Sequence, residues 1–356
     1  MTEKILLCGN EAIAEAAIQS GCRYYYGYPI TPQNEISAYM SYRMPQVGGT
    51  FIQAESELAA INMVYGTATT GKRVLTSSSG PGISLKQEGI SYLAGSELPA
   101  VIVNVMRAGP GLGNITPSQA DYFQATRGGG HGDYRTIVLA PASVQESADL
   151  TKRAFVLADK YRIPVMLLLD GMQGQMREPV LIEPLKETEQ FDKSWCLTGC
   201  KGRKPNIARS LYLEDKALPD LNERLLKRYA EIEKREIDVD QYKTGDADIV
   251  IVAYGTPARM CRSMVDLFRK KGVKVGLFRP ITLWPFPYDL LEKTSKHTQE
   301  YLVVEWSAGQ LIEDVRLALG KSKPIHFHGV LGGRLMKINE VESKLDSIIA
   351  NMGAHI

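Results

Sequence analysis

Two almost unbroken apolar runs, at 101–105 and 165–169, constrain the fold more than any other feature of this sequence. A strand that is apolar on both faces must be covered on both, which is typical of parallel sheets in α/β proteins. A shorter run of the same kind occurs at 74–76, and helix patterns at 57–70 and 144–161 directly precede the runs at 74–76 and 165–169. The alternation of strand and helix predicts an α/β domain with a doubly wound parallel sheet.

The pattern divides the chain into three parts. Residues 1–180 form the predicted first domain, and residues 181–247 are charged and rich in turns, which indicates a connector. Within the connector, 222–239 is amphipathic with mixed charges, as in a helix that packs one face on a neighbour. A second, smaller α/β domain is predicted over 248–356, beginning with the apolar run at 249–252. The length of 356 residues suits two domains.

The charge balance and the cysteines exclude several classes of function. The 42 basic and 40 acidic residues give a formal net charge of +2, so we expect neither nucleic acid nor a membrane surface as the main partner. The N-terminal apolar run is too short for a signal peptide and no stretch reaches the length of a membrane span, so we expect a cytoplasmic protein. The five cysteines form no cluster that could hold iron and sulfur, and we expect buried apolar thiols and no metal site on this chain.

Polar and glycine-rich segments follow four successive strands of the predicted first domain. They are the segments at 27–32, 55–57, 76–82 and 106–114. Ligands of open α/β sheets bind at the carboxyl ends of the strands, so we expect these segments to gather at one crevice. Two prolines of the first segment restrict the backbone around Thr31 and would hold its hydroxyl and nearby amides in fixed positions.

Three of these motifs carry a resemblance to a known family. The Tyr-Pro-Ile-Thr-Pro motif at 28–32, the Thr-Ser-Ser-Ser-Gly-Pro-Gly turn at 76–82 and Arg-Ala-Gly-Pro at 107–110 resemble, in the same order, segments of the alpha subunits of 2-oxoacid:ferredoxin oxidoreductases. The resemblance continues into the second domain through 254–256 and 278–287. It implies a first domain of the thiamine-diphosphate pyrimidine-binding type and a second domain similar to the transketolase C-terminal domain.

Further segments resemble one branch of this family. They lie at 61–66, 129–134 and 170–172, and they are similar to the 2-oxoisovalerate (3-methyl-2-oxobutanoate) enzymes. The resemblance therefore implies oxidative decarboxylation of a branched-chain 2-oxoacid. In this reaction the 2-oxoacid, coenzyme A and oxidised ferredoxin give acyl-CoA, carbon dioxide and reduced ferredoxin.

The resemblance also implies roles for individual residues. Glu57, with a glycine nine residues later, matches the glutamate that hydrogen-bonds the cofactor's aminopyrimidine ring and favours the tautomer that takes the C2 proton. Arg107 would pair with the carboxylate of the 2-oxoacid, because a planar guanidinium can bind it bidentately. Thr31 would donate a hydrogen bond to the substrate region, while Tyr28 and Pro29 would shape the pocket beside the cofactor.

Each of these residues also has an ordinary structural interpretation. Glu57 and its neighbour Glu55 both fit helix-start carboxylates that interact with the helix dipole, and Glu55 is the one we assign to that task. Arg107 fits a surface ion pair, and Tyr28 fits simple packing. His131 lies between glycines, and the sequence assigns it no role.

Two expected parts of such an enzyme are missing from the chain. The sequence has no Gly-Asp-Gly segment with a downstream asparagine, the motif that holds the cofactor's diphosphate through a divalent metal, and it lacks the cysteines for an iron–sulfur cluster. The resemblance therefore implies thiamine diphosphate shared with a beta subunit. Magnesium and iron–sulfur clusters would lie on beta, gamma and ferredoxin-like partner subunits.

Three hypotheses for the function remain open at the level of the sequence. The first is the subunit for branched-chain 2-oxoacids, and the second is the same reaction on 2-oxoglutarate or pyruvate. The residues beside Thr31 and Arg107 do not separate these two, because the partner subunit would also line the pocket. The third is a non-catalytic nucleotide-binding scaffold, since fold alone does not fix function.

Overall fold

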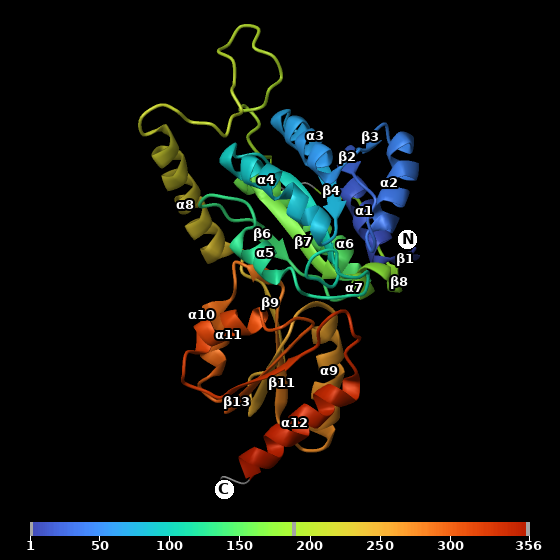
Figure 1. Ribbon diagram of the computed structural model, residues 1–356, viewed down its shortest axis with the longest axis vertical. Helices are drawn as coiled ribbons and strands as arrows, with labels where there is room; N and C mark the ends of the chain where they lie inside the picture. The colour runs from blue at the N-terminus through green and yellow to red at the C-terminus, as the bar shows by residue number, and fades with distance from the viewer. Residues whose placement is uncertain (1–2, 187–189, 354–356) are drawn as a thin grey trace.

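The computed structural model describes residues 3–186 and 190–353, which form two α/β units stacked along the long axis of the molecule (Figure 1). The main sheet of the first unit contains β2 (Tyr24–Gly27), β3 (Thr50–Gln53), β4 (Val74–Ser78), β5 (Ala100–Met106), β6 (Ile137–Leu139), β7 (Pro164–Asp170) and β12 (Thr282–Trp284). These seven strands have the order β12-β6-β7-β5-β4-β2-β3, and all neighbours are parallel except β12, which runs antiparallel to β6. The predicted doubly wound α/β sheet is confirmed.

Helices cover both faces of this sheet. They are α1 (Gly9–Gln19), α2 (Asn34–Gln46), α3 (Glu57–Thr69), α4 (Pro81–Gly95), α5 (Tyr122–Arg127), α6 (Val144–Tyr161) and α7 (Gly171–Gln175). Helix α1 packs against α2 and α6, and α3 packs against α4, so two separate helical layers enclose the strands. Strands β4, β5 and β7 are buried along their whole length, because each lies between these layers.

The first strand of the chain differs from the buried strand that its apolar sequence predicts. Strand β1 (Ile5–Cys8) pairs with β8 (Arg177–Val180) in a separate two-stranded antiparallel ribbon. Ile5 and Leu6 are 44% and 62% exposed, and only the Cys8 end of the strand is buried. The prediction of a buried strand was wrong because an apolar run reveals hydrophobicity but not whether a second layer covers it.

Helix α8 (Ala217–Arg235) lies in the second half of the predicted connector. One face of α8 is buried, and its Tyr229 ring packs edge-on against Trp284 at 5.8 Å. The helix ends at Arg235, four residues before the end of the amphipathic segment predicted over 222–239, and strand β9 (Val239–Tyr242) begins at the last residue of that segment. Strand β9 pairs antiparallel with a strand of the second unit. The division at 180 and 247 stays a prediction.

The second unit is a smaller sheet with its own helices. Its strands are β9, β10 (Ile249–Val252), β11 (Val275–Pro280), β13 (Glu300–Glu305) and β14 (Ile325–Gly329), in the order β14-β13-β10-β11-β9. Its helices are α9 (Gly255–Lys270), α10 (Tyr288–Thr294), α11 (Leu311–Leu319) and α12 (Ile338–Gly353). Strand β12 leaves this unit to pair with β6 of the first sheet. Within residues 3–186 and 190–353, no helix has the length and apolar character needed to cross a membrane.

A buried carboxylate joins the two units. Asp170 is 1% exposed and caps α7 by accepting a hydrogen bond from the Gln173 amide at 3.0 Å. The same carboxylate accepts bonds from the Thr256 hydroxyl at 2.9 Å and the Thr256 amide at 3.3 Å, at the start of α9. Burial raises the pKa of Asp170, and these donors act in the opposite direction.

Replacement of Asp170 should therefore weaken the whole chain. We expect Asp170→Ala to lower the free energy of unfolding by about 2–4 kcal/mol, because buried donors lose a charged acceptor. Urea denaturation followed by circular dichroism measures this loss. The exposed Asp149 on α6 provides the control, and Asp149→Ala should stay within about 0.5 kcal/mol of wild type. Equal effects of the two variants would contradict the role of Asp170.

Candidate functional site

The four polar segments that the sequence singled out follow four neighbouring strands of the first sheet. These strands are adjacent in the order β5-β4-β2-β3, so their carboxyl ends lie along one edge. The chain passes from β2 to β3 on one side and then returns to place β4 on the other side of β2. Such a reversal of strand order is the position where ligands of open α/β sheets bind.

Glu57 is the first residue of α3 and points toward the beginning of α4. The Ser56 hydroxyl caps α3 by accepting a hydrogen bond from the Ala59 amide at 3.1 Å. The Glu57 side chain is 6% exposed, whereas Glu55 is exposed. A side chain on Gly82 would overlap both the Glu57 carboxylate and the Ser78 hydroxyl, so the start of α4 lies directly against Glu57.

The Thr76–Ser79 segment at the carboxyl end of β4 is completely buried despite its hydroxyl groups. Ser77 bonds to the Gln33 side chain at 2.5 Å and to the Tyr25 hydroxyl at 2.7 Å. In contrast, the hydroxyl oxygens of Ser78 and Ser79 have no hydrogen-bond partner within the described part of the chain. Buried polar groups are nearly always paired, so these two hydroxyls indicate a place where a ligand completes the contacts.

Arg107 lies on the other side of this turn. It is 7% exposed, and its Nη1 and Nη2 donate to the carbonyls of Thr31 at 3.1 Å and Leu112 at 3.0 Å. Its Nε has no acceptor among the described residues. Two neutral carbonyls orient the guanidinium without neutralising its charge, so Arg107 is arranged to attract an anion.

Arg107 lines a cleft of about 360 Å³. The other lining residues are Gly80, Pro81, Ser84, Ala108, Gly109, Pro110, Gly111 and Asp121. Asp121 accepts a hydrogen bond from the Asn104 side chain at 3.0 Å, and burial raises its pKa while the charge of Arg107 acts to lower it. The cleft therefore combines a cation, a carboxylate and glycine-rich backbone.

The remaining residues predicted from the sequence occupy the rim of this region. The Thr31 carbonyl is held by Arg107, and its hydroxyl accepts a long hydrogen bond of 3.3 Å from Asn34. Tyr28 is 38% exposed and Pro29 is also exposed, so both lie on the open side of the β2 loop. His131 is exposed as well, and only its carbonyl is bonded, to the Ser91 hydroxyl.

Sequence reasoning did not find Lys86 of α4. Its side chain is fully buried, and its Nζ donates to the Thr76 hydroxyl at 2.6 Å and the Ser77 carbonyl at 3.0 Å. The signal was present, because Lys86 lies three residues after Ile83 and four before Ile90, on the same buried helix face. A charged residue inside an apolar helical stripe is a candidate for a functional role.

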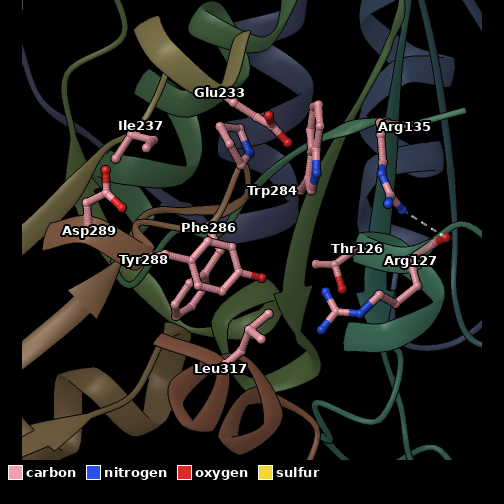
Figure 2. Close-up of a pocket in the computed structure, with 11 residues that line it drawn as sticks. Thr126, Arg127, Arg135, Glu233, Ile237, Trp284, Phe286, Tyr288, Asp289 and Leu317 are labelled. Atoms are coloured by element: carbon pink, nitrogen blue, oxygen red, sulfur yellow. Dashed lines mark hydrogen bonds between the residues drawn. The ribbon is translucent and has the colours of Figure 1, made fainter. Parts of the chain in front are cut away.

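A larger cavity of about 550 Å³ lies where α5, α8 and β12 meet α10 and α11 (Figure 2). It has an aromatic wall formed by Trp284, Phe286 and Tyr288. The guanidinium of Arg127 in this cavity already pairs with the buried Asp314 carboxylate at 2.8 Å. The segment at 278–287 contributes Trp284, Pro285 and Phe286 to this cavity, but none of the candidate catalytic or cofactor-binding residues lines it, so we assign the site to the strand edge.

The described residues contain neither a metal-binding cluster nor a disulfide bond. They contain no group of three or more histidine, cysteine, aspartate or glutamate side chains that could hold a metal ion. All five cysteines are free, and Cys200 is exposed, which corrects the expectation that every thiol is buried. Cys200 lies in the turn-rich loop before α8, where the apolar character of a thiol is not enough to bury it.

Family models match almost the whole chain. Residues 15–236 match the thiamine-diphosphate-binding domain of pyruvate flavodoxin/ferredoxin oxidoreductases, and residues 247–341 match core domain II of pyruvate:ferredoxin oxidoreductase. The chain belongs to the 2-oxoacid:ferredoxin oxidoreductase family. The resemblance predicted from the three motifs is confirmed.

Curated relatives within the family align over nearly their full length. The ketoisovalerate oxidoreductase subunit VorB of Methanothermobacter thermautotrophicus is 50% identical over 96% of this chain and 96% of its own. The 2-oxoglutarate synthase subunit KorA of Methanocaldococcus jannaschii is 38% identical over 94% of this chain and 97% of its own. The predicted branch of the 2-oxoacid:ferredoxin oxidoreductase family agrees with the first of these relatives.

Solved structures show the same fold. The 2-oxoglutarate:ferredoxin oxidoreductase from Magnetococcus marinus, solved with 2-oxoglutarate, coenzyme A and succinyl-CoA bound, has a TM-score of 0.85 and 26% identity. The alignment covers 97% of this chain and 65% of that longer one. A split-gene transketolase has a TM-score of 0.57 at 14% identity, which supports the fold alone.

The packing around Gly82 gives a direct test of the site. We expect Gly82→Ala to lower the free energy of unfolding by about 1–3 kcal/mol, because a methyl group there overlaps the Glu57 carboxylate and the Ser78 hydroxyl. Gly95, at the other end of α4, is the matched control, since a Cβ there meets its nearest neighbour at an ordinary 3.5 Å. Urea denaturation of both variants compares the two positions. Equal stability would mean that the site has room beside Glu57.

Proposed function

We propose that this chain is a catalytic subunit of a thiamine-diphosphate-dependent 2-oxoacid:ferredoxin oxidoreductase that oxidises a branched-chain 2-oxoacid with coenzyme A. The observation that carries the proposal is the buried Glu57 carboxylate, which faces the start of α4 at the point where the strand order reverses. The identity of 50% to a ketoisovalerate oxidoreductase subunit supports the choice of substrate.

The residues around Glu57 fit the aminopyrimidine ring of thiamine diphosphate. Gly82 has no side chain, which lets the start of α4 lie directly against the Glu57 carboxylate, and the free hydroxyls of Ser78 and Ser79 offer polar contacts beside it. When bound, this cofactor would supply a carbon nucleophile for the 2-keto carbon and an electron sink for the pair that remains when carbon dioxide leaves. Glu57 would hold a proton at a ring nitrogen, and its burial strengthens that hydrogen bond by excluding water.

Arg107 would bind the carboxylate of the 2-oxoacid. Its guanidinium is fixed by hydrogen bonds to the neutral Thr31 and Leu112 carbonyls, and Asp121 is the carboxylate that lines the same cleft. Fixed in this way, Arg107 would orient the keto carbon without losing much side-chain entropy on binding. Thr31 would contribute its hydroxyl from the loop after β2, while Tyr28 and Pro29 would form the outer wall.

The cleft itself favours a 2-oxoacid with one carboxylate. Among its described lining residues Arg107 is the only cation, and Asp121 is the only other charged side chain. A second substrate carboxylate, as in 2-oxoglutarate, would meet Asp121 without a second cation to pair with it. An apolar branched side chain carries no such charge, which supports the branched-chain substrate over 2-oxoglutarate.

A partner subunit would complete this site. Apolar side chains are exposed around the same edge of the sheet, among them Ile52 (39%), Leu58 (44%), Leu85 (56%) and Leu112 (78%). Exposed apolar groups that surround a polar site are typical of a protein interface. We propose that a beta subunit covers this edge and holds the cofactor's diphosphate through magnesium. Gamma and ferredoxin-like subunits would complete a cytoplasmic complex, with the iron–sulfur clusters on these partners.

The assembled complex allows a direct test of the two charged residues. We expect Glu57→Gln to lower kcat by about 100-fold or more, because an amide, unlike a carboxyl group, cannot exchange a proton with the ring nitrogen. We expect Arg107→Ala to lower kcat/KM for 2-oxoisovalerate by about 50-fold, the loss of a charge-assisted hydrogen bond. Coenzyme-A-dependent reduction of a viologen dye under anaerobic conditions measures both.

The exposed Glu55 provides the matched control, and Glu55→Gln should retain wild-type activity. A complex that assembles and keeps full activity with Glu57→Gln would refute the assignment of the catalytic glutamate and favour a scaffold. Faster turnover of 2-oxoglutarate than of 2-oxoisovalerate would refute the substrate preference while leaving the reaction class intact.

A further inference from the structure

Asp121 is the carboxylate that lines the cleft beside Arg107. It lies directly before α5, but its side chain does not cap that helix. Instead, one oxygen of its carboxylate accepts a hydrogen bond from the Asn104 side chain of β5 at 3.0 Å. The Asp121 side chain is therefore directed toward the strand ends and the cleft, where a substrate would meet it.

A glutamine of the second unit holds the backbone on both sides of Asp121. Gln310, directly before α11, donates through Nε2 to the Ala120 carbonyl at 2.7 Å. Its Oε1 accepts a hydrogen bond from the Phe123 amide at 2.8 Å. One side chain thus uses both its donor group and its acceptor on a single short segment, which fixes the position and the orientation of that segment.

A carboxylate of α11 holds the residue next to Asp121. Asp314 is fully buried, and it accepts hydrogen bonds from the Tyr122 hydroxyl at 2.5 Å and from Arg127 Nη2 at 2.8 Å. The Tyr122 ring is fully buried as well. The residues before and after Asp121 are therefore both bonded to the second unit.

The start of α11 is fixed within its own unit. Glu305 is fully buried at the end of β13. Its carboxylate accepts hydrogen bonds from three successive backbone amides, at 3.0 Å from Gln310, 3.0 Å from Leu311 and 3.2 Å from Ile312. Hydrogen bonds to a charged acceptor are among the stronger ones in proteins. Because Gln310 cannot shift without breaking them, it gives the segment around Asp121 a fixed support.

We propose that Gln310 is a positioning residue for substrate selection: it holds Asp121 at the cleft, where the Asp121 carboxylate discriminates against a 2-oxoacid that carries a second carboxylate. This inference rests on the proposed function. Two like charges in one cleft repel, and the repulsion depends on the distance between them. The described lining residues of the cleft all come from the first unit, so the second unit acts on selection through Asp121.

The test measures a ratio of specificities in the assembled complex. It is kcat/KM for 2-oxoisovalerate divided by kcat/KM for 2-oxoglutarate, from coenzyme-A-dependent reduction of a viologen dye. Both substrates are assayed on one preparation, so a partial loss of folded or assembled protein cancels in the ratio. Gln310→Met preserves the length of the side chain but removes both hydrogen bonds to the segment around Asp121.

We expect Asp121→Asn to lower this ratio by about 10-fold, because an amide does not repel a second substrate carboxylate. We expect Gln310→Met to lower it by about 5-fold, because Asp121 is no longer held in place. When Asp121→Asn is already present, Gln310→Met should change the ratio by less than about 1.5-fold, since the group that Gln310 positions is gone.

Two outcomes would overturn the proposal. The first is an equal fall of the ratio on Gln310→Met with and without Asp121→Asn, which would mean that Gln310 acts independently of Asp121. The second is a Gln310→Met complex in which both values of kcat/KM fall together and the ratio stays constant, as a merely structural role requires. Gln299 is exposed and provides the matched control, so Gln299→Met should leave the ratio unchanged.

The same assays separate this inference from the proposed function. A wild-type complex that oxidises neither substrate, or that prefers 2-oxoglutarate, refutes the proposed function and the inference with it. A wild-type complex that prefers 2-oxoisovalerate, together with an unchanged ratio in Asp121→Asn, leaves the proposed function intact and overturns the roles of Asp121 and Gln310.

A second measurement does not depend on turnover. Hydrogen–deuterium exchange, followed by mass spectrometry of the assembled complex, reports on the amides of 118–127. We expect Gln310→Met to raise the exchange rate in this segment by about 10-fold, because the Phe123 amide loses its acceptor. Gln299→Met should leave it unchanged. Exchange in Gln310→Met equal to that of wild type would overturn the proposal, because Gln310 would then not hold the segment.

Discussion

The close packing of three elements around Gly82 is the constraint on which the site depends. The start of α4 approaches the start of α3 and the end of β4 so closely that no side chain fits between them. This contact holds the Glu57 carboxylate and the Ser78 hydroxyl in one place. It exists because β3 and β4 lie on opposite sides of β2, which brings the ends of consecutive strands to a common edge.

Burial strengthens the electrostatic interactions of the charged groups at this edge. Glu57, Lys86 and Arg107 are all less than 10% exposed, and protein and not water surrounds them. Neutral hydroxyls and carbonyls accept the hydrogen bonds of the Lys86 amine and the Arg107 guanidinium, and no carboxylate of the described residues bonds to either. In such surroundings a single proton changes the local field considerably, which is why enzymes arrange perturbed groups of this kind at reacting centres.

The second unit supports the site from a distance. The segment after Arg107 crosses to that unit, where Asn114 donates to the Gly332 carbonyl at 2.8 Å and Gln119 bonds the Trp306 amide at 3.0 Å. Since these bonds fix the far end of the segment, they restrict how far the arginine's own backbone can move. The hydrogen bonds between the two units therefore help to hold the site in place, in addition to joining the units.

The sequence by itself determined the local elements and the position of the motifs. Helix α6 and strand β7 lie where their patterns predicted, because the pattern of apolar residues is a local property that a segment carries with it. Only the tertiary structure decided which segments meet. Strand β12 pairs with β6 in the first sheet, and the first residues of β1 are exposed. Lys86 and Glu57 are both buried, although both carry ionisable groups. The physical reason is that contacts between distant segments depend on how layers pack, and a one-dimensional pattern of hydrophobicity does not contain that information.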